Sequence, residues 1–531
     1  MKITTIDYNN VSALSYKDLS YINLESYLTD YYRFQPSIEG FAEAINERLN
    51  KPVNRDVLVD NIKHDYSAVE VTDQQFDNIE ALSSKHTFTI VTAHQPSLFG
   101  GPLYYIFKIC SVINLCKQLN KHYDDYHFVP TFISGGEDHD FDEIDHMHLY
   151  NKTVKWNRDA SGPVGRLDLE GLDIAIEDLA GIIGTSLHAI EMIELLKSCK
   201  NGAKTYGDFV FRFVNKLFGK YGLIVLDMDN VAYKKQFSEV LKRELLEGIS
   251  KPYVVKTQEK LLKNRFKAQA FPREINLFYL GAGGRQRIEK KQNGFYILKT
   301  DLVFTEAEII EELENHPENF SPNVIMRPLY QESIVPNLAY IGGGGEIAYW
   351  LERKSQFKAF GVFYPMLIRR NSAMILNKGD VKIMDKLNLS IEDVFKEEQE
   401  LISAFVAKQS PVNLSLTDEK NSLKTTFNSI ATKSKEVDPT LEKSVLAEMS
   451  KLLKNVNNME SRMERAVKAR EDINVKKINK LKQKLFPNNG LQERFANFLP
   501  HYISIGPDFF DVLIENLNPM DRKFVVLSDL V

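Results

Sequence analysis

The stretch HTFTIVTAHQPSLFGGPLYYIFKICSVINLCKQL, at positions 86–119, decides the fold of this chain. Its apolar run FTIVT predicts a buried strand, and two glycines before Pro102 predict the start of a helix. Apolar residues recur at helical spacing from Ile106 to Leu115, which gives that helix a broad buried face. FVPTFI, at 128–133, predicts a second strand. Such strand–helix–strand units cross over right-handed and build a parallel sheet.

Another strand–helix unit follows at YGLIVLDMDN, positions 221–230, which leads into the amphipathic YKKQFSEVLKRELLEG. Unbroken apolar strands that alternate with amphipathic helices predict an α/β fold with a doubly wound parallel sheet. The stretch 285–299 differs, because Asn293-Gly294 stands between two strand-like runs and predicts a β-hairpin. We interpret this hairpin as an insertion that decorates the parallel core.

The composition changes beyond about Lys386, where Lys, Glu, Asn, Leu and Met dominate and glycine is almost absent. Apolar residues repeat there at alternating spacings of four and three, which is a coiled-coil seam of about three heptads. The seam consists of Val445, Met449, Leu452, Val456, Met459, Met463 and Ala466. The stretch 391–409 predicts a helix antiparallel to this seam, and RKFVVLSDL at 522–530 predicts a strand that rejoins the core. The predicted domains are a core at 1–385, a coiled coil at 386–500 and a returning segment at 501–531.

The composition is that of a globular chain with room for roughly two to four domains. Of its 531 residues 43% are hydrophobic, and 67 basic residues nearly balance 72 acidic ones, for a net charge of -5. This balance does not favour a nucleic acid or an anionic membrane as a partner. No signal peptide is recognised, and no apolar stretch reaches the roughly 18 to 20 residues that span a bilayer. Cys110, Cys116 and Cys199 fit buried thiols in a reducing compartment, so we expect a cytoplasmic protein.

A first candidate site is TAHQPSLFGGP, where His94 and Gln95 end the first strand. Ligands of open α/β sheets bind at such carboxyl ends of strands. Exposed amides at Gly100 and Gly101, at the start of the helix, would bind an anion with the help of the helix dipole. The alternative is a tight turn whose two glycines only permit close packing.

The stretch ISGGEDHDFDEIDHMH, at 133–148, follows the next strand and should face the same crevice. If a helix begins near Asp142, the pairs Asp142/His146 and His139/Glu143 share helix faces. A carboxylate that orients an imidazole makes a general base, and the same groups suit substrate binding or a zinc or manganese ion. A structural network is the other interpretation. Neither an H-x-x-x-H pattern nor a cysteine ligand is present, so no metal is predicted.

The stretch SPNVIMRPLYQESIVPNLAYIGGGGEIAYWLERKSQF, at 321–357, carries four glycines that enter an amphipathic helix. Backbone amides there would cradle an anion, but Glu346 in the first helical turn would repel a phosphate. This pairing suits a zwitterion, with its ammonium on Glu346 and its carboxylate on the amides. The alternative is that Glu346 only complements the helix dipole. Arg369, Arg370 and Asn371 follow another apolar run and are placed to reach the crevice.

Together TAHQPSLFGGPLYYIFK, GGEDHDFDEIDH, the glycine-bearing stretch 321–350 and PMLIRRNS at 365–372 resemble one family, bacillithiol synthase BshC, the cysteine-adding enzymes of bacillithiol biosynthesis. The resemblance covers essentially the whole chain and departs at Ala93, where the family's TGxQ turn has glycine. It implies a Rossmann-like core with connecting insertions, similar to class I nucleotidyltransferases, and a coiled coil that forms a homodimer. It also implies the last biosynthetic step, which joins L-cysteine to the amine of glucosaminyl-malate.

The expected site residues follow from the crevice and from this resemblance. Of the expected catalytic residues, His94 would bind the activated carboxyl group and His139 would accept the amine proton, with Asp140 and Asp142 beside them. The expected substrate-binding residues are Gln95, Glu137, Asp138, Gln331, Glu332, Asn337, Glu346, Trp350, Arg369, Arg370 and Asn371. The expected anion-binding residues are Gly100, Gly101, Gly343, Gly344 and Gly345, with ATP or ADP as the candidate nucleotide.

Two other classes of protein stay open. One is a nucleotide-dependent ligase or nucleotidyltransferase that uses the same crevice on a different small molecule. The other is a non-catalytic coiled-coil interaction protein, against which the intact EDHD and RRN stretches argue.

Overall fold

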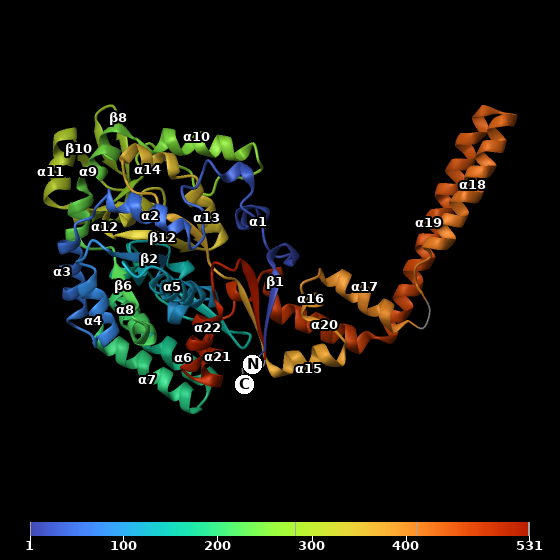
Figure 1. Ribbon diagram of the computed structural model, residues 1–531, viewed down its shortest axis with the longest axis horizontal. Coiled ribbons are helices and arrows are strands. Elements are labelled where there is room, and N and C mark those ends of the chain that lie inside the picture. Colours follow the sequence, from blue (N-terminus) through green and yellow to red (C-terminus); the bar gives the residue numbers. More distant parts are fainter. Residues whose placement is uncertain (1, 282, 411–412, 529–531) are drawn as a thin grey trace. The chain divides into compact units, whose positions relative to one another are not determined.

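The computed structural model describes residues 2–281, 283–410 and 413–528 and divides into two compact units (Figure 1). The core unit comprises Met1–Tyr8, Leu14–Ile375 and Gln492–Val531, and the helical unit comprises Asn9–Ala13 and Leu376–Leu491. Both boundaries lie about ten residues before those expected from composition. The reason is that α15, at Lys378–Lys386, already belongs to the helical unit, where Asp380 pairs with Lys484 at 2.6 Å.

A five-stranded parallel sheet forms the centre of the core unit, in the order β13-β12-β2-β3-β6. Its strands are β2 at Thr87–His94, β3 at His127–Ser134, β6 at Ile224–Asp227, β12 at Asn337–Gly342 and β13 at Met366–Arg369. The winding direction reverses between β2 and β12, which makes this a doubly wound sheet, as predicted. Ligands of such sheets bind outside the carboxyl ends of the strands at this switch point.

Helices cover both faces of the sheet because successive strand residues point to opposite sides. Phe132 and Val225 face a core that includes α5, at Leu103–His122, and α8, at Tyr206–Phe218. The neighbours Ile133 and Leu226 face a second core with α3, at Arg55–Tyr66, α9, at Val231–Glu247, and α12, at Arg327–Ile334. The predicted helix after Pro102 is therefore confirmed as α5.

The expected insertion is a second five-stranded sheet, in the order β10-β9-β8-β7-β11. Its strands are β7 at Leu277–Gly281, β8 at Gly284–Lys291, β9 at Gly294–Ile297, β10 at Val303–Phe304 and β11 at Phe320–Pro322. The predicted hairpin is confirmed, but Lys291 pairs with Gly294, so the two-residue turn is Gln292–Asn293, one residue earlier than expected. Gly294 itself has a φ of +139°, which a residue with a Cβ rarely adopts.

The chain end returns to the core unit, as expected. β15, at Lys523–Ser528, pairs antiparallel with β1, at Lys2–Asp7, and β14, at Ala373–Leu376, completes this sheet. A two-stranded sheet joins β4 at His146–Leu149 to β5 at Lys152–Lys155. The other core helices are α1 at Tyr16–Ile22, α2 at Gly40–Leu49, α4 at Asp73–Ala81, α6 at Leu172–Ile183, α7 at Leu187–Gly202, α10 at Ser250–Leu262, α11 at Glu306–Asn315, α13 at Gly344–Leu351, α14 at Lys354–Phe360, α21 at Leu499–Ile505 and α22 at Asp508–Asn516.

The helical unit contains the predicted seam in α19, at Pro439–Arg470. Its antiparallel partner is α18, at Thr417–Val437, joined to it by the ion pairs Lys420–Glu460 and Lys435–Glu442. The stretch 391–409, expected to be that partner, instead forms α16 at Ile391–Val394 and α17 at Glu398–Gln409. Heptad spacing identifies a helix that needs a partner but does not say which helix supplies it. The remaining helix is α20 at Asp472–Leu485.

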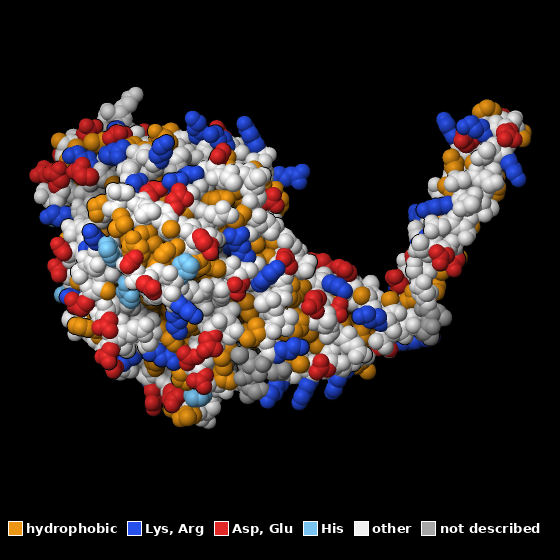
Figure 2. Space-filling model, in the orientation of Figure 1, with side chains coloured by type: hydrophobic (Ala, Val, Ile, Leu, Met, Phe, Trp, Pro, Cys, Tyr) orange, Lys and Arg blue, Asp and Glu red, His pale blue; other side chains and the backbone are white. Residues whose placement is uncertain are grey.

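Acidic and basic side chains are interspersed over the face in Figure 2, which matches the near balance of charge in the sequence. Within the part of the chain that the structure describes, no helix has the length and apolar character needed to cross a membrane.

Candidate active site at the carboxyl end of the parallel sheet

His94 ends β2 at the switch point, partly buried under α5. Its Nδ1 lies 2.9 Å from the carbonyl oxygen of Gln95, and its Nε2 lies 3.0 Å from the hydroxyl of Tyr104. A carbonyl only accepts, so Nδ1 carries the proton and Nε2 accepts from Tyr104. Burial and the charge of Lys108 lower the pKa of His94 to about 4. The imidazole is therefore neutral at physiological pH, and it orients the Tyr104 hydroxyl rather than supplying a positive charge.

Glu346 is the anionic centre of the polar cluster at the carboxyl end of the sheet. Its carboxylate accepts from the Lys108 ammonium at 2.8 Å, the Tyr340 hydroxyl at 2.6 Å and the Gly343 amide at 2.9 Å. Burial alone would raise its pKa, but Lys108, Tyr340 and Gly343 lower it to about 2. The helix-capping alternative is thus present in the structure. An incoming substrate ammonium would have to compete with Lys108 for this carboxylate.

Lys108 was missed by sequence reasoning although it stands in an otherwise apolar helical run, YYIFKIC. Its side chain is fully buried, and its ammonium also donates to the carbonyl oxygen of Ala93 at 2.5 Å. A buried lysine is costly unless it is paired, so a lysine within a core pattern is the signal that could have found it. Lys108 links the end of β2 to the start of α13.

The glycines at the start of α13 do not form an open anion site. The Gly343 amide is taken by Glu346, and the carboxylate of Asp18 lies 2.3 Å from the position that a Cβ at Gly344 would occupy. Only Gly345 faces open space. Asp18 is itself held by the guanidinium of Arg369, at 2.9 and 3.0 Å. Arg369 therefore positions a carboxylate of α1 over α13 rather than reaching into the crevice as expected.

Arg370, by contrast, keeps one buried donor that pairs with none of the described residues. Its Nη2 donates to Glu493 at 2.7 Å, and its guanidinium lies 5.2 Å from the ring centre of Tyr104. Its Nε is buried and has no hydrogen-bond partner among the described residues. The Cβ position at Gly343 is 3.6 Å from this nitrogen, so the donor faces the glycine turn. Asn371, the next residue, is structural: it accepts from Ser111 and donates to the Asn518 carbonyl.

The predicted phosphate site at Gly100 and Gly101 is wrong for this structure. Their amides already donate to Ser97 and Leu98, at 3.3 and 2.9 Å. The Asn497 amide covers the turn by donating to the Gly101 carbonyl at 2.6 Å. Both glycines have positive φ, +81° and +52°, so the packing alternative explains them. Asn497 is 396 residues from Gly101 in the sequence, so no local sequence pattern could predict this contact.

The acidic and histidine-rich stretch forms no helix, so the predicted pairs four residues apart do not exist. A short 3-10 turn at Phe141–Glu143 leads directly into β4. Asp140 and Asp142 are exposed, and His146 instead contacts the adjacent Asp145 at 2.7 Å. The chain is extended or loop-like here, and only a helix brings side chains four residues apart into contact.

Gln95 brings part of this stretch to the crevice. Its amide donates to Asp138 and Glu143, each at 2.9 Å. Arg285, from β8 of the inserted sheet, lies 3.5 Å from Asp138 and 3.3 Å from Nδ1 of the half-exposed His139. Arginine only donates, so this nitrogen of His139 accepts. Arg285 is a second residue that the sequence did not reveal, since it lies in the stretch interpreted as decoration.

Four expected substrate-binding residues lie away from the crevice. Asn337 begins β12, so it sits roughly 17 Å from the carboxyl end of that strand. Glu332 accepts from Asn337 at 2.8 Å and from Gln331 at 2.7 Å in a fully buried cluster. Trp350 packs against Tyr340 with ring centres 4.7 Å apart. These side chains pack in the core and do not join the polar groups at the carboxyl end of the sheet.

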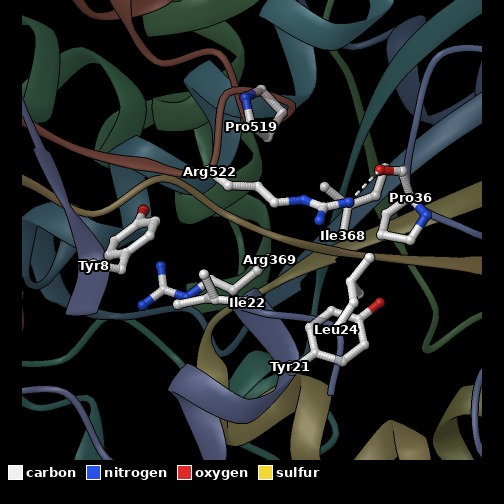
Figure 3. Close-up of a pocket in the computed structure, with 9 residues that line it drawn as sticks. All are labelled: Tyr8, Tyr21, Ile22, Leu24, Pro36, Ile368, Arg369, Pro519 and Arg522. Atoms are coloured by element: carbon white, nitrogen blue, oxygen red, sulfur yellow. Dashed lines mark hydrogen bonds between the residues drawn. The ribbon is translucent and has the colours of Figure 1, made fainter. Parts of the chain in front are cut away.

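A separate pocket shares only Arg369 with the expected site. It is lined by Tyr8, Tyr21, Ile22, Leu24, Pro36, Ile368, Arg369, Pro519 and Arg522 (Figure 3). Arg522 crosses it and donates to the Pro36 carbonyl at 2.8 Å. Among the described residues, no group of three or more His, Cys, Asp or Glu side chains is arranged to hold a metal ion.

These features define the class of protein. The strand order, the polar side chains at the switch point and a helical coiled-coil unit together make this a Rossmann-like α/β protein with a coiled-coil domain. Residues 1–371 match the family described as "Bacillithiol biosynthesis BshC, N-terminal Rossmann-like domain", and residues 373–528 match "Bacillithiol biosynthesis BshC, C-terminal coiled-coil domain". The chain therefore belongs to the BshC family of bacillithiol biosynthesis, and the resemblance seen in the sequence is confirmed.

Relatives of similar length agree with this assignment. Proteins named "Putative cysteine ligase BshC" from Flavobacterium johnsoniae and Flavobacterium psychrophilum are each 38% identical to this chain, over 99% of its length and 100% of theirs. One with the same name from Bacillus cytotoxicus is 25% identical over 92% of this chain and 94% of its own.

Proposed function

We propose that this chain catalyses the last step of bacillithiol biosynthesis, in which the carboxyl group of L-cysteine is joined to the amine of glucosaminyl-malate as an amide. Family membership and the name cysteine ligase borne by its relatives support a ligase. The polarity of the crevice supports this pair of reacting groups.

The observation that carries the proposal is the placement of donors and acceptors along the crevice. On the β12 side, the unpartnered Nε of Arg370 suits a carboxylate. On the β3 side, the carboxylates of Asp138 and Glu143 and the imidazole of His139 suit an amine that arrives protonated. Amide formation needs a carboxyl site and an amine site side by side, because holding the two groups together removes most of the entropic barrier.

His94 acts in this scheme through Tyr104. The neutral imidazole accepts from the Tyr104 hydroxyl, and the ring of Tyr104 packs against Arg370. His94 thereby orients the carboxyl-binding side of the crevice. A nucleotide, ATP or ADP, is the proposed cosubstrate, since a free carboxylate must be activated before an amine attacks it. The glycines expected to hold its phosphates do not fit that role, because their amides or surroundings are already occupied.

Arg370→Lys tests the carboxyl site. Lysine keeps the positive charge beside Glu493 but lacks the Nε donor of arginine. Wild type should convert cysteine, glucosaminyl-malate and ATP to bacillithiol, detected by mass spectrometry. The variant should raise the KM for cysteine by about tenfold, which is the loss of one charge-assisted hydrogen bond.

Two controls accompany this variant. Arg158→Lys changes an arginine whose contacts with Asp168 lie elsewhere on the core unit, and it should leave the KM unchanged. Arg370 is buried and also donates to the Asn371 carbonyl oxygen, so Arg370→Lys should lower the melting temperature, and the KM is compared at a temperature at which both proteins are folded. An unchanged KM for cysteine in Arg370→Lys would contradict the assignment of this donor, and a wild type that forms no bacillithiol would contradict the proposed reaction itself.

We also propose a homodimer formed through α18 and α19. No residue of α19 is fully buried, and Ala431 is the one fully buried residue of α18. The apolar side chains of Ile430, Leu452 and Met459 remain 42%, 40% and 58% exposed. A hairpin of two helices leaves such residues uncovered, and a second copy of the hairpin would cover them.

The cytoplasm is the proposed location. Cys110, Cys116 and Cys199 are all free and buried. Burial also raises the pKa of each thiol above its usual value, which makes these cysteines unreactive core residues. Nothing in their placement calls for an oxidising compartment.

A further inference from the structure

Three strand ends form one row along the crevice: His94 of β2, Ser134 of β3 and Asp227 of β6. The strand register pairs His94 with Ser134 and Ser134 with Asp227. Paired residues of adjacent parallel strands project to the same face, and strands lie about 4.8 Å apart, so Asp227 stands roughly 10 Å from His94. The hydroxyl of Ser134, between them, is buried and has no hydrogen-bond partner among the described residues. The row continues the candidate site from His94 to β6, beyond Asp138 and Glu143, which accept from Gln95.

Asp227 has no ion pair among the described residues, whereas its neighbours Asp229 and Glu137 each have at least one. Arg166 binds Asp229 at 2.5 and 2.8 Å, and Lys234 pairs with both Asp229 and Glu137. The hydrogen bond described for Asp227 comes from the backbone amide of Asp229, at 2.9 Å. The charged and titratable groups that face Asp227 are Glu137, Asp229, Asp65, Arg166, Tyr233 and Tyr330.

The two neighbouring carboxylates take different protonation states. Burial, and then the negative charges of Asp229, Glu137 and Asp65, raise the pKa of Asp227 to about 7. Burial alone would raise the pKa of Asp229 too, but Arg166 and Lys234 hold it below its usual value. Pairs of acidic groups whose environments separate them in this way mark acid–base sites, and a base that titrates near neutral pH is the most effective.

We propose that Asp227, rather than His139, accepts the proton of the substrate amine. The proposal rests on the proposed amide-forming function. The amine nitrogen attacks the carboxyl carbon of cysteine, already activated by a nucleotide, and the new C–N bond forms as the phosphate-bearing leaving group departs with its electron pair. The proton lost by nitrogen passes to Oδ of the Asp227 carboxylate. His139 is half exposed and already accepts from Arg285, so it serves the rim of the site.

The test is the pH profile of kcat/KM for glucosaminyl-malate between about pH 5.5 and about pH 9. Wild type should lose activity below about pH 7, where the base becomes protonated. Asp227→Asn should be about a hundred- to ten-thousand-fold slower and should lack this acid limb. It should also be at least as stable as wild type above neutral pH, because the amide removes a buried negative charge.

Two further variants separate catalysis from structure. Asp229→Asn removes a charge that raises the Asp227 pKa, so its acid limb should move to lower pH. His139→Ala should keep the limb where wild type has it. An unchanged limb in Asp227→Asn, or a limb abolished by His139→Ala alone, overturns the inference while the proposed reaction stands. A wild type that makes no bacillithiol overturns both.

Discussion

Replacing Glu346 by glutamine should destabilise the core unit through Lys108. Glutamine keeps only one acceptor oxygen, whereas Glu346 accepts from Tyr340 with Oε1 and from the Gly343 amide with Oε2, so the change removes the charge and one of these two hydrogen bonds. The Lys108 ammonium is then left fully buried beside a neutral amide. Breaking one side of a buried ion pair typically costs about 3–5 kcal/mol, because the remaining charge stays in the protein interior without a partner.

The lowered pKa of Glu346 gives a similar magnitude for the free energy of this ion pair. The pKa of Glu346 falls from 4.5 to about 2. A difference of one pKa unit corresponds to about 1.4 kcal/mol, so the charged form of Glu346 contributes about 3 kcal/mol. For a unit of roughly four hundred residues, such a loss lowers the melting temperature by about 3–4 °C. A lowered folded-state pKa stabilises fully above pH 4.5, and this stabilisation is lost as the pH falls through about 2.

The assay is thermal unfolding of wild type and Glu346→Gln at about pH 7 and about pH 3. The difference between the two proteins should be full at neutral pH and less than half as large at the acidic pH. Glu308→Gln is the matched control, because Glu308 closes a capping box in α11 in the same way but faces solvent. Its melting temperature should fall by less than about 1 °C. Equal effects of the two substitutions would refute the role of Lys108.

Two further predictions concern the buried carboxyl group of Glu332 and the exposed side chain of Met459. Burial raises the pKa of Glu332 from 4.5 to about 7, so its favourable contribution is present below pH 4.5 and is lost as the pH rises through 7. Glu332→Gln should therefore be more stable than wild type at about pH 8, by about 3 kcal/mol in urea unfolding, and a pH dependence equal to that of wild type would contradict this. Met459→Lys should convert the dimer to a monomer in light scattering, whereas Asn458→Lys, at an exposed neighbouring position, should not. A wild type that is monomeric at micromolar concentration would remove the dimer proposal.

The sequence by itself determined the class of fold and the family. The spacing of apolar residues is a local property of the sequence, and this spacing is enough to recognise a strand or a helix. The seam of α19 and the return of β15 were readable for the same reason, and Asn293-Gly294 indicated the hairpin, although its turn lies one residue earlier than predicted. Long motifs spread from Thr92 to Ser372 then identified the BshC family, because so many matched positions are far more specific than one short pattern.

Only the tertiary structure decided which side chains meet in the crevice. Lys108 lies 238 residues from Glu346, and Asp18 lies 351 residues from Arg369, so no local spacing could pair them. Glu332 and Asn337 were expected at the site from the predicted crevice and the resemblance, yet Asn337 lies at the start of β12, opposite the carboxyl end, and Glu332 of α12 accepts from it there. Asp227 gained its role from Asp229, Glu137 and Asp65, which three different elements bring together. A sequence shows which groups can carry charge, but burial and the partners across the fold set the energy of that charge.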